Sequence, residues 1–155
     1  MARHFIRNSS RTKARTVGCL LINKLINCVM LDGKKKTATK IVRKALGFIE
    51  YEIGVNAVKT MHEAIDNVTP YMEIRQIKVG GVSYSIPVDV TPKRRLGLAI
   101  RWIISSLKYR RETGTWIKLA WELIDSALCR SLAWKKKELI HSSALANQAF
   151  AHLGW

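Results

Sequence analysis

The chain has 155 residues, of which 48% are hydrophobic, so it can bury a core and is most simply one domain spanning residues 1–155. Its 27 Lys and Arg residues outnumber 11 Asp and Glu residues, and the resulting net charge of +16 predicts a polyanionic partner. No apolar run approaches the roughly 20 residues of a membrane span, because Asn23, Lys24 and Asn27 interrupt the longest candidate. Charge alone leaves DNA, RNA and a membrane surface open. Its clustering along the chain favours nucleic acid, and we expect no membrane partner.

Residues 1–15 are expected to form a basic N-terminal arm. They contain no acidic residue, and their cations are Arg3, Arg7, Arg11, Lys13 and Arg15. The arm superficially resembles a mitochondrial transit peptide, but it is short and runs straight into the first expected helix. We therefore expect it to be disordered when free and to bind RNA.

Three amphipathic helices are expected after the arm. They cover about residues 17–31, 37–53 and 56–68, and they are followed by Asp32-Gly33, Gly54 and Thr69-Pro70, residues typical of helix ends. Lys34, Lys35 and Lys36 are expected in the turn between the first two helices. Water or phosphate can solvate three adjacent cations, and the charge of the whole chain favours phosphate.

A β-hairpin arm is expected over residues 72–90, with its turn at Gly80-Gly81. Apolar residues recur at every second position of its second strand, namely Val82, Tyr84, Ile86, Val88 and Val90. A Gly-Gly pair suits a tight turn because both central residues need positive φ. The first strand changes phase near Gln76, which predicts a bulge or a twist. Pro87 cannot donate to a ladder, so its strand is expected to be an edge.

A fourth, basic helix is expected to follow the hairpin directly. Thr91-Pro92 is typical of an N-cap and a first helical residue. Its apolar face is Leu96, Ala99, Ile100, Ile103 and Leu107, and a cationic stripe is formed by Arg94, Arg101 and Lys108 at a spacing of seven. Arg95 adds a cation near the start of this helix, and Arg110 and Arg111 are expected near its end.

Two more helices complete the expected body. The fifth follows residues 113–115 and is expected to bury Ile117, Ala120, Trp121, Ile124, Ala127 and Leu128. The sixth is expected to open with Trp134, followed by Lys135, Lys136 and Lys137. Cations at a helix N-terminus oppose the macrodipole, which indicates an external anion there. Trp102, Trp116 and Trp121 are expected in the core or lining a groove, and stacking on a base is the alternative for one of them.

Motifs for catalysis are absent. The sequence contains no Walker-type loop, Gly-x-Gly-x-x-Gly, His-Glu-x-x-His or Gly-x-Ser-x-Gly pattern. Cys19, Cys28 and Cys129 have no metal-ligand spacing and are expected to be buried free thiols in a reducing compartment. We expect neither an enzyme nor a bound cofactor or metal.

Three blocks of the sequence closely resemble the family of the seventh protein of the small ribosomal subunit, bacterial and organellar type. The first is Asp32-Gly33-Lys34-Lys35 after Ile26-Asn27. The second is Val79-Gly80-Gly81, Tyr84, Ile86-Pro87-Val88 and Leu98-Ala99-Ile100-Arg101-Trp102. The third is Lys135-Lys136-Lys137-Glu138, Ala146-Asn147 and Ala149-Phe150-Ala151-His152. They occur in the family's order and spacing, and the resemblance covers the chain from about residue 17.

The resemblance implies a mainly α fold, a six-helix bundle with a two-stranded β-hairpin protruding between helices three and four. It also implies a protein that binds the 3′ major domain of small-subunit rRNA and nucleates assembly of the head. Residues expected to bind rRNA are Arg3, Arg7, Arg11, Lys13, Arg15, Lys34, Lys35, Lys36, Arg75, Lys78, Arg94, Arg95, Arg101, Lys108, Arg110, Arg111, Lys135, Lys136 and Lys137. Residues expected near the exit-site tRNA and the mRNA are Lys78, Gly80, Gly81, Ser83, Tyr84, Asn147 and His152. Implied protein neighbours are protein eleven of the platform and head proteins nine, thirteen and nineteen.

Several positions depart from the family's pattern. Thr16-Val17-Gly18 replaces an Asp-Pro-Tyr segment, Ile77-Lys78 replaces a pair of arginines, and Gln148 replaces an arginine. These departures predict a divergent lineage, so a mitochondrion or plastid is favoured over a bacterial cytoplasm. Synthesis inside the organelle is expected, because no long presequence precedes the first helix.

Two other functions remain alternatives. A helical body with a β-arm also suits an architectural DNA-binding protein that bends duplex DNA through the minor groove. An RNA-processing enzyme would be distinguished by metal-dependent turnover of the bound RNA.

Overall fold

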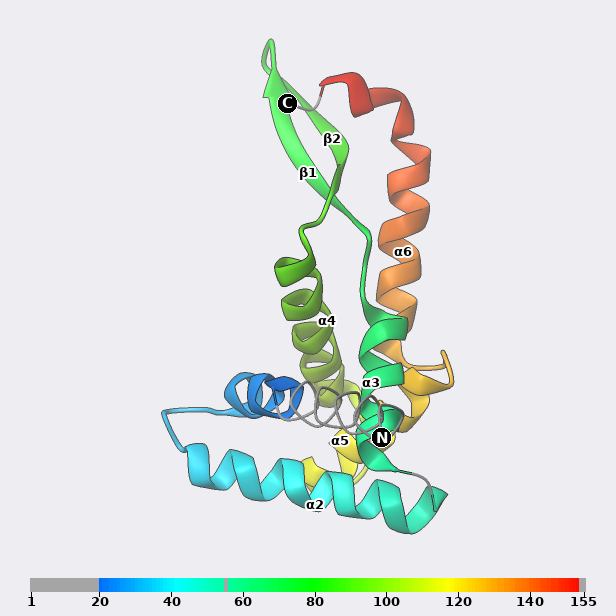
Figure 1. Ribbon diagram of the computed structural model, residues 1–155. Coiled ribbons are helices and arrows are strands. Elements are labelled where there is room, and N and C mark those ends of the chain that lie inside the picture. The colour runs from blue at the N-terminus through cyan, green and yellow to red at the C-terminus, as the bar shows by residue number, and fades with distance from the viewer. Residues whose placement is uncertain (1–19, 55, 154–155) are drawn as a thin grey trace, which may run out of the picture.

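The computed structural model describes residues 20–54 and 56–153, which form six α-helices, two short 3-10 helices and one β-hairpin (Figure 1). The first helix is described over residues 20–29. The later elements are α2 (Lys35–Ile53), α3 (Ala57–Val68), β1 (Met72–Val79), β2 (Val82–Asp89), α4 (Pro92–Ser106), η1 (Leu107–Tyr109), α5 (Thr115–Ala127), α6 (Leu132–Ala146) and η2 (Gln148–Leu153). The predicted helical bundle with a hairpin between the third and fourth helices is confirmed. The expected basic arm and the start of the first helix lie outside the described residues.

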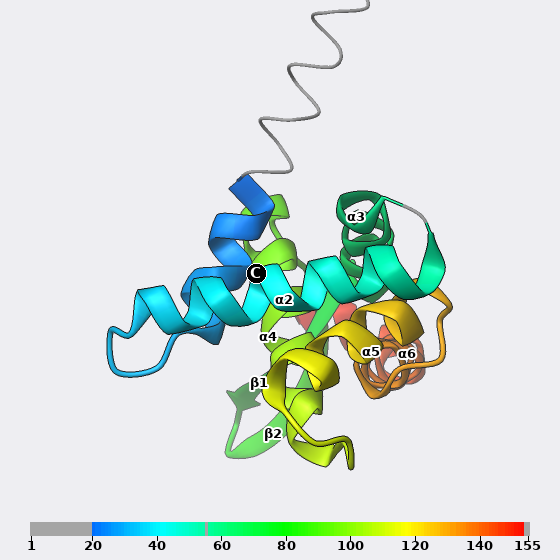
Figure 2. The same cartoon turned by 90° about the horizontal axis from the view of Figure 1, so that it is seen from below.

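The core lies where α5 packs against α2 and α3, with α4 and the first helix closing it. Figure 2 shows α2 crossing the end of the body next to α5. The fully buried side chains of the core include Leu25, Val42, Met61 and Ile103. Burial of such aliphatic side chains contributes about 1.5–3 kcal/mol each before conformational entropy is subtracted. No helix among the described residues is long and apolar enough to cross a membrane.

The predicted buried face of α5 was partly wrong. Trp121 is 36% exposed and Leu128 is 53% exposed, whereas Leu119 and Leu123 are fully buried. Because α5 carries apolar residues around much of its circumference, helical spacing alone does not identify its inner face. Trp121 instead lies on the flank of the core, where its ring meets Phe48 edge to face at 6.1 Å. The described cysteines, Cys28 and Cys129, are free, but both are exposed, so their predicted burial was wrong.

Residues with positive φ end the first two helices as predicted. Asp32 has φ of 51° and Gly33 has φ of 71° after the first helix, and Gly54 caps α2 with φ of 66°. The expected turn between these helices is shorter than predicted, because α2 begins at Lys35. Lys34 is its N-cap, and Lys35 and Lys36 occupy its first turn.

Two glycines of α2 are expected to respond oppositely to alanine. Gly47 lies inside the helix with open space around its missing Cβ, so Gly47→Ala should stabilise the protein by about 0.5–1 kcal/mol. Gly54 needs a left-handed backbone, so Gly54→Ala should destabilise it by about 1 kcal/mol. Urea denaturation of both variants checks this pair, and a loss of stability in Gly47→Ala would contradict it.

The hairpin has an unbroken register. Met72 pairs with Asp89 at its base and Val79 with Val82 at its end, which leaves a two-residue turn at Gly80 and Gly81. Their φ angles of 58° and 86° confirm the expected turn. Of the two expected alternatives near Gln76, the bulge is absent, and Figure 1 shows the twist of the strands about each other.

The C-terminal region buttresses the hairpin. α6 lies beside β1, and η2 folds over β2 (Figure 1). The ring of Tyr84 lies 5.5 Å from that of Phe150 in η2. Burial decreases toward the tip, since Ile86 is fully buried while Val82 is 55% exposed. Only the outer part of the hairpin therefore projects as an arm.

Candidate nucleic-acid interface

α2 carries a dense row of exposed cations. Lys36, Lys40 and Lys44 recur at every fourth residue and therefore share one face, with Lys35 and Arg43 beside them. These residues and Thr39 line an open hollow of about 700 Å³. Lys40, Arg43 and Lys44 were missed from the sequence, although their spacing and the absence of acidic residues between Asp32 and Glu50 are visible there. A surface of this kind suits a run of phosphates.

The cationic stripe of α4 is exposed as predicted, but one end is tied to the hairpin. Arg94 Nε and Arg75 Nη2 each donate to the carboxylate of Glu73 at 2.8 Å. Desolvation works to raise the pKa of Glu73, but hydrogen bonds from Arg94 and Arg75 outweigh it and hold that pKa below its ordinary value. This cluster joins β1 to α4 and keeps a net positive charge. Arg101 and Lys108 complete the exposed stripe.

A second set of contacts fixes the base of the arm. Arg95 Nε donates to the Val90 carbonyl at 2.7 Å, and its guanidinium lies 5.0 Å from the centre of the Tyr71 ring. The backbone N–H of Tyr71 donates to His141 Nε2 at 3.2 Å. Arg95 is thus half-buried and structural, and His141 connects α6 to the chain entering β1.

His141 makes the base of the arm sensitive to acid. Desolvation and the nearby charge of Lys137 lower the pKa of His141 below its ordinary value. His141 therefore binds a proton more readily in the unfolded chain than in the folded protein. The stability that neutral His141 contributes is present above about pH 6.5 and is lost as pH falls through its folded pKa. Wild type should lose more melting temperature than His141→Gln between about pH 7.5 and about pH 5. An equal fall in melting temperature in both proteins would contradict the role of His141. His62→Gln, on α3, is the matched control and should behave like wild type.

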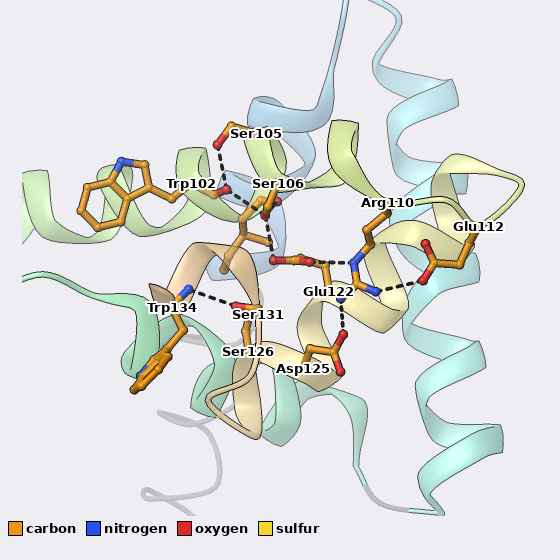
Figure 3. Close-up of polar contacts among 11 residues, drawn as sticks. Trp102, Ser105, Ser106, Arg110, Glu112, Glu122, Asp125, Ser126, Ser131 and Trp134 are labelled. Atoms are coloured by element: carbon orange, nitrogen blue, oxygen red, sulfur yellow. Dashed lines mark hydrogen bonds and ion pairs between the residues drawn. The ribbon is translucent and has the colours of Figure 1, made fainter. Parts of the chain in front are cut away.

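Arg110 is enclosed by carboxylates rather than presented to a ligand (Figure 3). Its guanidinium donates to Glu122 at 2.6 Å, to Glu112 at 3.0 Å and to Asp125. Its side chain is 13% exposed and that of Glu122 is 1% exposed. Desolvation works to lower the pKa of Arg110, but the hydrogen bonds that it donates to Asp125 and Glu122 outweigh it and raise that pKa. Arg110 therefore does not join the interface, whereas Arg111 is exposed.

The lysines of α6 divide between surface and structure. The helix begins at Leu132, not at Trp134, and Ser131 caps it by accepting from the Trp134 N–H. Lys135 and Lys136 are exposed one turn inside the helix. Lys137 is half-buried and donates to the Asn67 carbonyl at 2.8 Å, which ties α6 to α3.

The residues expected near tRNA and mRNA separate in the same way. Lys78, Ser83 and the two turn glycines lie exposed at the end of the hairpin. Tyr84 is half-buried against Phe150, and Asn147 donates to the Ser143 carbonyl at 2.8 Å at the end of α6. The backbone of His152 lies in η2. The outer hairpin is thus the part of this group open to a ligand.

The described residues contain no group of three or more metal-ligating side chains. Exposed lysines and arginines cluster on the first half of α2, on α4 and in the first turns of α6, and Lys78 adds one cation near the hairpin tip. Several acidic residues are instead paired internally, in the clusters around Arg110 and Glu73. Such a surface can neutralise many phosphates at once.

Comparison with known proteins identifies the family. A family model described as ribosomal protein S7p/S5e matches residues 2–148. The small ribosomal subunit protein uS7A/uS7B of Bartonella bacilliformis is 44% identical over 138 residues, which are 89% of this chain and 88% of that protein. The small ribosomal subunit proteins uS7 of Mesorhizobium japonicum and Brucella anthropi are 46% and 47% identical over the same shares of each chain. The chain therefore belongs to the ribosomal protein S7p/S5e family, whose members are structural components and not enzymes.

Proposed function

We propose that the protein is a structural constituent of the small ribosomal subunit that binds the 3′ major domain of the rRNA and nucleates assembly of the head. The relatives named above are small-subunit proteins and are similar over most of both chains. The observation that carries the rRNA proposal is the set of exposed cations on α2, α4 and α6. Among the described ion pairs, none involves Lys36, Lys40 or Lys136.

The proposed mechanism is architectural. Phosphates crowd together where rRNA helices meet, and several cationic surfaces on one rigid core can neutralise them at fixed separations. RNA duplexes hide their base edges in a deep, narrow groove, so recognition should use shape, 2′-OH groups and phosphates, with unpaired loops supplying specificity. The buried packing of α5 against α2 and α3 sets the spacing of these surfaces.

The outer hairpin is proposed to lie along the path of the exit-site tRNA and the mRNA. Its exposed tip, with Lys78 and Ser83, supports contact with nucleic acid. Neighbouring ribosomal proteins eleven, nine, thirteen and nineteen are proposed from the resemblance. Exposed apolar side chains on α6, Leu132, Leu139 and Leu145, support a protein neighbour there.

The compartment stays a prediction. The relatives named above come from bacteria, so they lend no support to a mitochondrion or plastid. Mass spectrometry of ribosomes from purified organelles and from cytoplasm of the source cell decides between them. An organellar ribosome that lacks the protein would overturn the organelle prediction.

The test of the proposed function is competition between two nucleic acids of equal charge. Purified protein is mixed with a transcript of the 3′ major domain and with duplex DNA at about 0.15 M salt. We expect selective binding of the transcript. Equal affinity for both would favour the architectural DNA-binding alternative, and metal-dependent cleavage of the transcript would favour an RNA-processing enzyme.

A further inference from the structure

A groove between α4 and α6 combines aromatic side chains with a cation. It encloses about 370 Å³ and is lined by Trp102, Ser105, Ser106, Tyr109, Leu132, Ala133 and Lys136. That volume lies near the lower end of known small-ligand sites, so the groove could hold one nucleotide but not a duplex. None of its lining residues is acidic.

Tyr109 is the unusual member of this groove. It lies on the 3-10 turn η1 and is 77% exposed, although a core position would cover such a ring. Trp102 lies on α4 and is half-buried against the core. An exposed aromatic ring beside a half-buried one offers a platform for a flat, apolar ligand.

The cations around the groove point to an anionic ligand. Lys136 Nζ lies 5.6 Å from the centre of the Trp102 ring. Arg101 on α4 and Lys108 on η1 are both exposed and stand directly next to the lining residues Trp102 and Tyr109 in the chain. A base that enters the groove would therefore leave its phosphates beside exposed cations.

The polar groups at the groove floor are already satisfied. The Ser105 hydroxyl donates to the Trp102 carbonyl at 2.9 Å, and that of Ser106 donates to buried Glu122 at 2.7 Å (Figure 3). Both serine hydroxyls therefore have their one donor hydrogen engaged, which leaves stacking as the main capability of the groove.

We propose that this groove holds one unpaired nucleotide of the bound rRNA, with its base stacked on Tyr109 and its phosphate beside Lys136. This inference rests on the proposed function and assigns one of its contacts. Unpaired bases in RNA loops are commonly splayed out and stacked on aromatic side chains, and such stacking tolerates any base. None of the lining residues would repel a phosphate, and the exposed ring of Tyr109 suits a flat base.

The experiment compares Tyr109→Ala, Tyr109→Phe and Tyr51→Ala in binding the 3′ major domain transcript over a range of salt. Tyr109→Ala removes the stacking platform and should weaken binding by about five- to 150-fold. The salt slope should stay unchanged, because stacking releases no counterions. Tyr109→Phe keeps the ring and should bind within about twofold of wild type. Tyr51 is 85% exposed at the far end of α2, so Tyr51→Ala is the matched control and should bind like wild type.

Each other outcome overturns a definite part of the account. If wild type binds the transcript selectively and Tyr109→Ala binds equally well, the nucleotide site is wrong and the proposed function stands. If Tyr109→Ala binds normally but no longer joins particles containing the other small-subunit proteins, the groove receives a protein segment. If wild type shows no selectivity, the proposed function itself fails. Because Tyr109 is exposed, the thermal unfolding of these variants should match wild type.

Discussion

Arg110→Met is expected to lower the free energy of unfolding by about 3–5 kcal/mol. The guanidinium neutralises Glu122, whose side chain is 1% exposed, and removing it leaves a buried carboxylate with Ser106 as its remaining donor. The cluster also joins the chain just after η1 to α5 (Figure 3), so its loss loosens the connection between α4 and α5. Domains of this size are stable by about 5–15 kcal/mol, so the change is a large fraction of the total.

Two comparisons separate a buried charge from simple loss of packing. Arg111→Met changes the adjacent, exposed arginine and should alter stability by no more than about 1 kcal/mol. Adding Glu122→Gln to Arg110→Met removes the stranded charge and should restore part of the lost stability. Urea denaturation of the four proteins measures this. A loss below about 1 kcal/mol in Arg110→Met would show that the cluster behaves like a surface ion pair.

The triple variant Lys36→Gln/Lys40→Gln/Lys44→Gln is expected to bind the 3′ major domain transcript about 50-fold more weakly at about 0.15 M salt. These three lysines form one exposed row on α2, and each neutralised phosphate contributes about 0.7–0.9 to the slope of log affinity against log salt. The slope should therefore become shallower by about 2. Glutamine keeps the helix propensity, so the fold should be retained.

Lys59→Gln is the control for this variant. Lys59 is an exposed helical lysine on α3, but it lies beside Glu63 at 3.6 Å. Removing the charge of Lys59 should change the affinity for the transcript by about twofold or less. A triple variant that binds as tightly as wild type, with an unchanged slope, would remove α2 from the interface.

Structural features that depend on residues close together in the sequence were predictable. Gly54 and Asp32-Gly33 end helices through a backbone conformation that few other residues adopt, and Gly80-Gly81 forms the two-residue turn for the same reason. The apolar face of α4 also followed from helical spacing, since Ala99, Ile100 and Ile103 are all buried. The cations of α2 beyond Lys36 could have been found from the same spacing.

Features that depend on tertiary contact were not predictable. Arg110 is as cationic as Arg111 in the sequence, and only the approach of Glu122 and Asp125 from α5 distinguishes them. Lys137 and Tyr84 similarly acquire structural roles from Asn67 and Phe150, which lie far away in the chain. The proposed interface is therefore a subset of the cations that the sequence offers, because contacts within the fold engage others, such as Arg110 and Lys137.

The salt dependence of binding tests the central claim most directly. If α2, α4, α6 and the hairpin together contact about eight phosphates, log affinity of wild type for the 3′ major domain transcript should fall with log salt at a slope of about −6 to −7. A slope near about −2 would mean that only two or three phosphates are contacted, which contradicts a protein that holds rRNA on several surfaces at once.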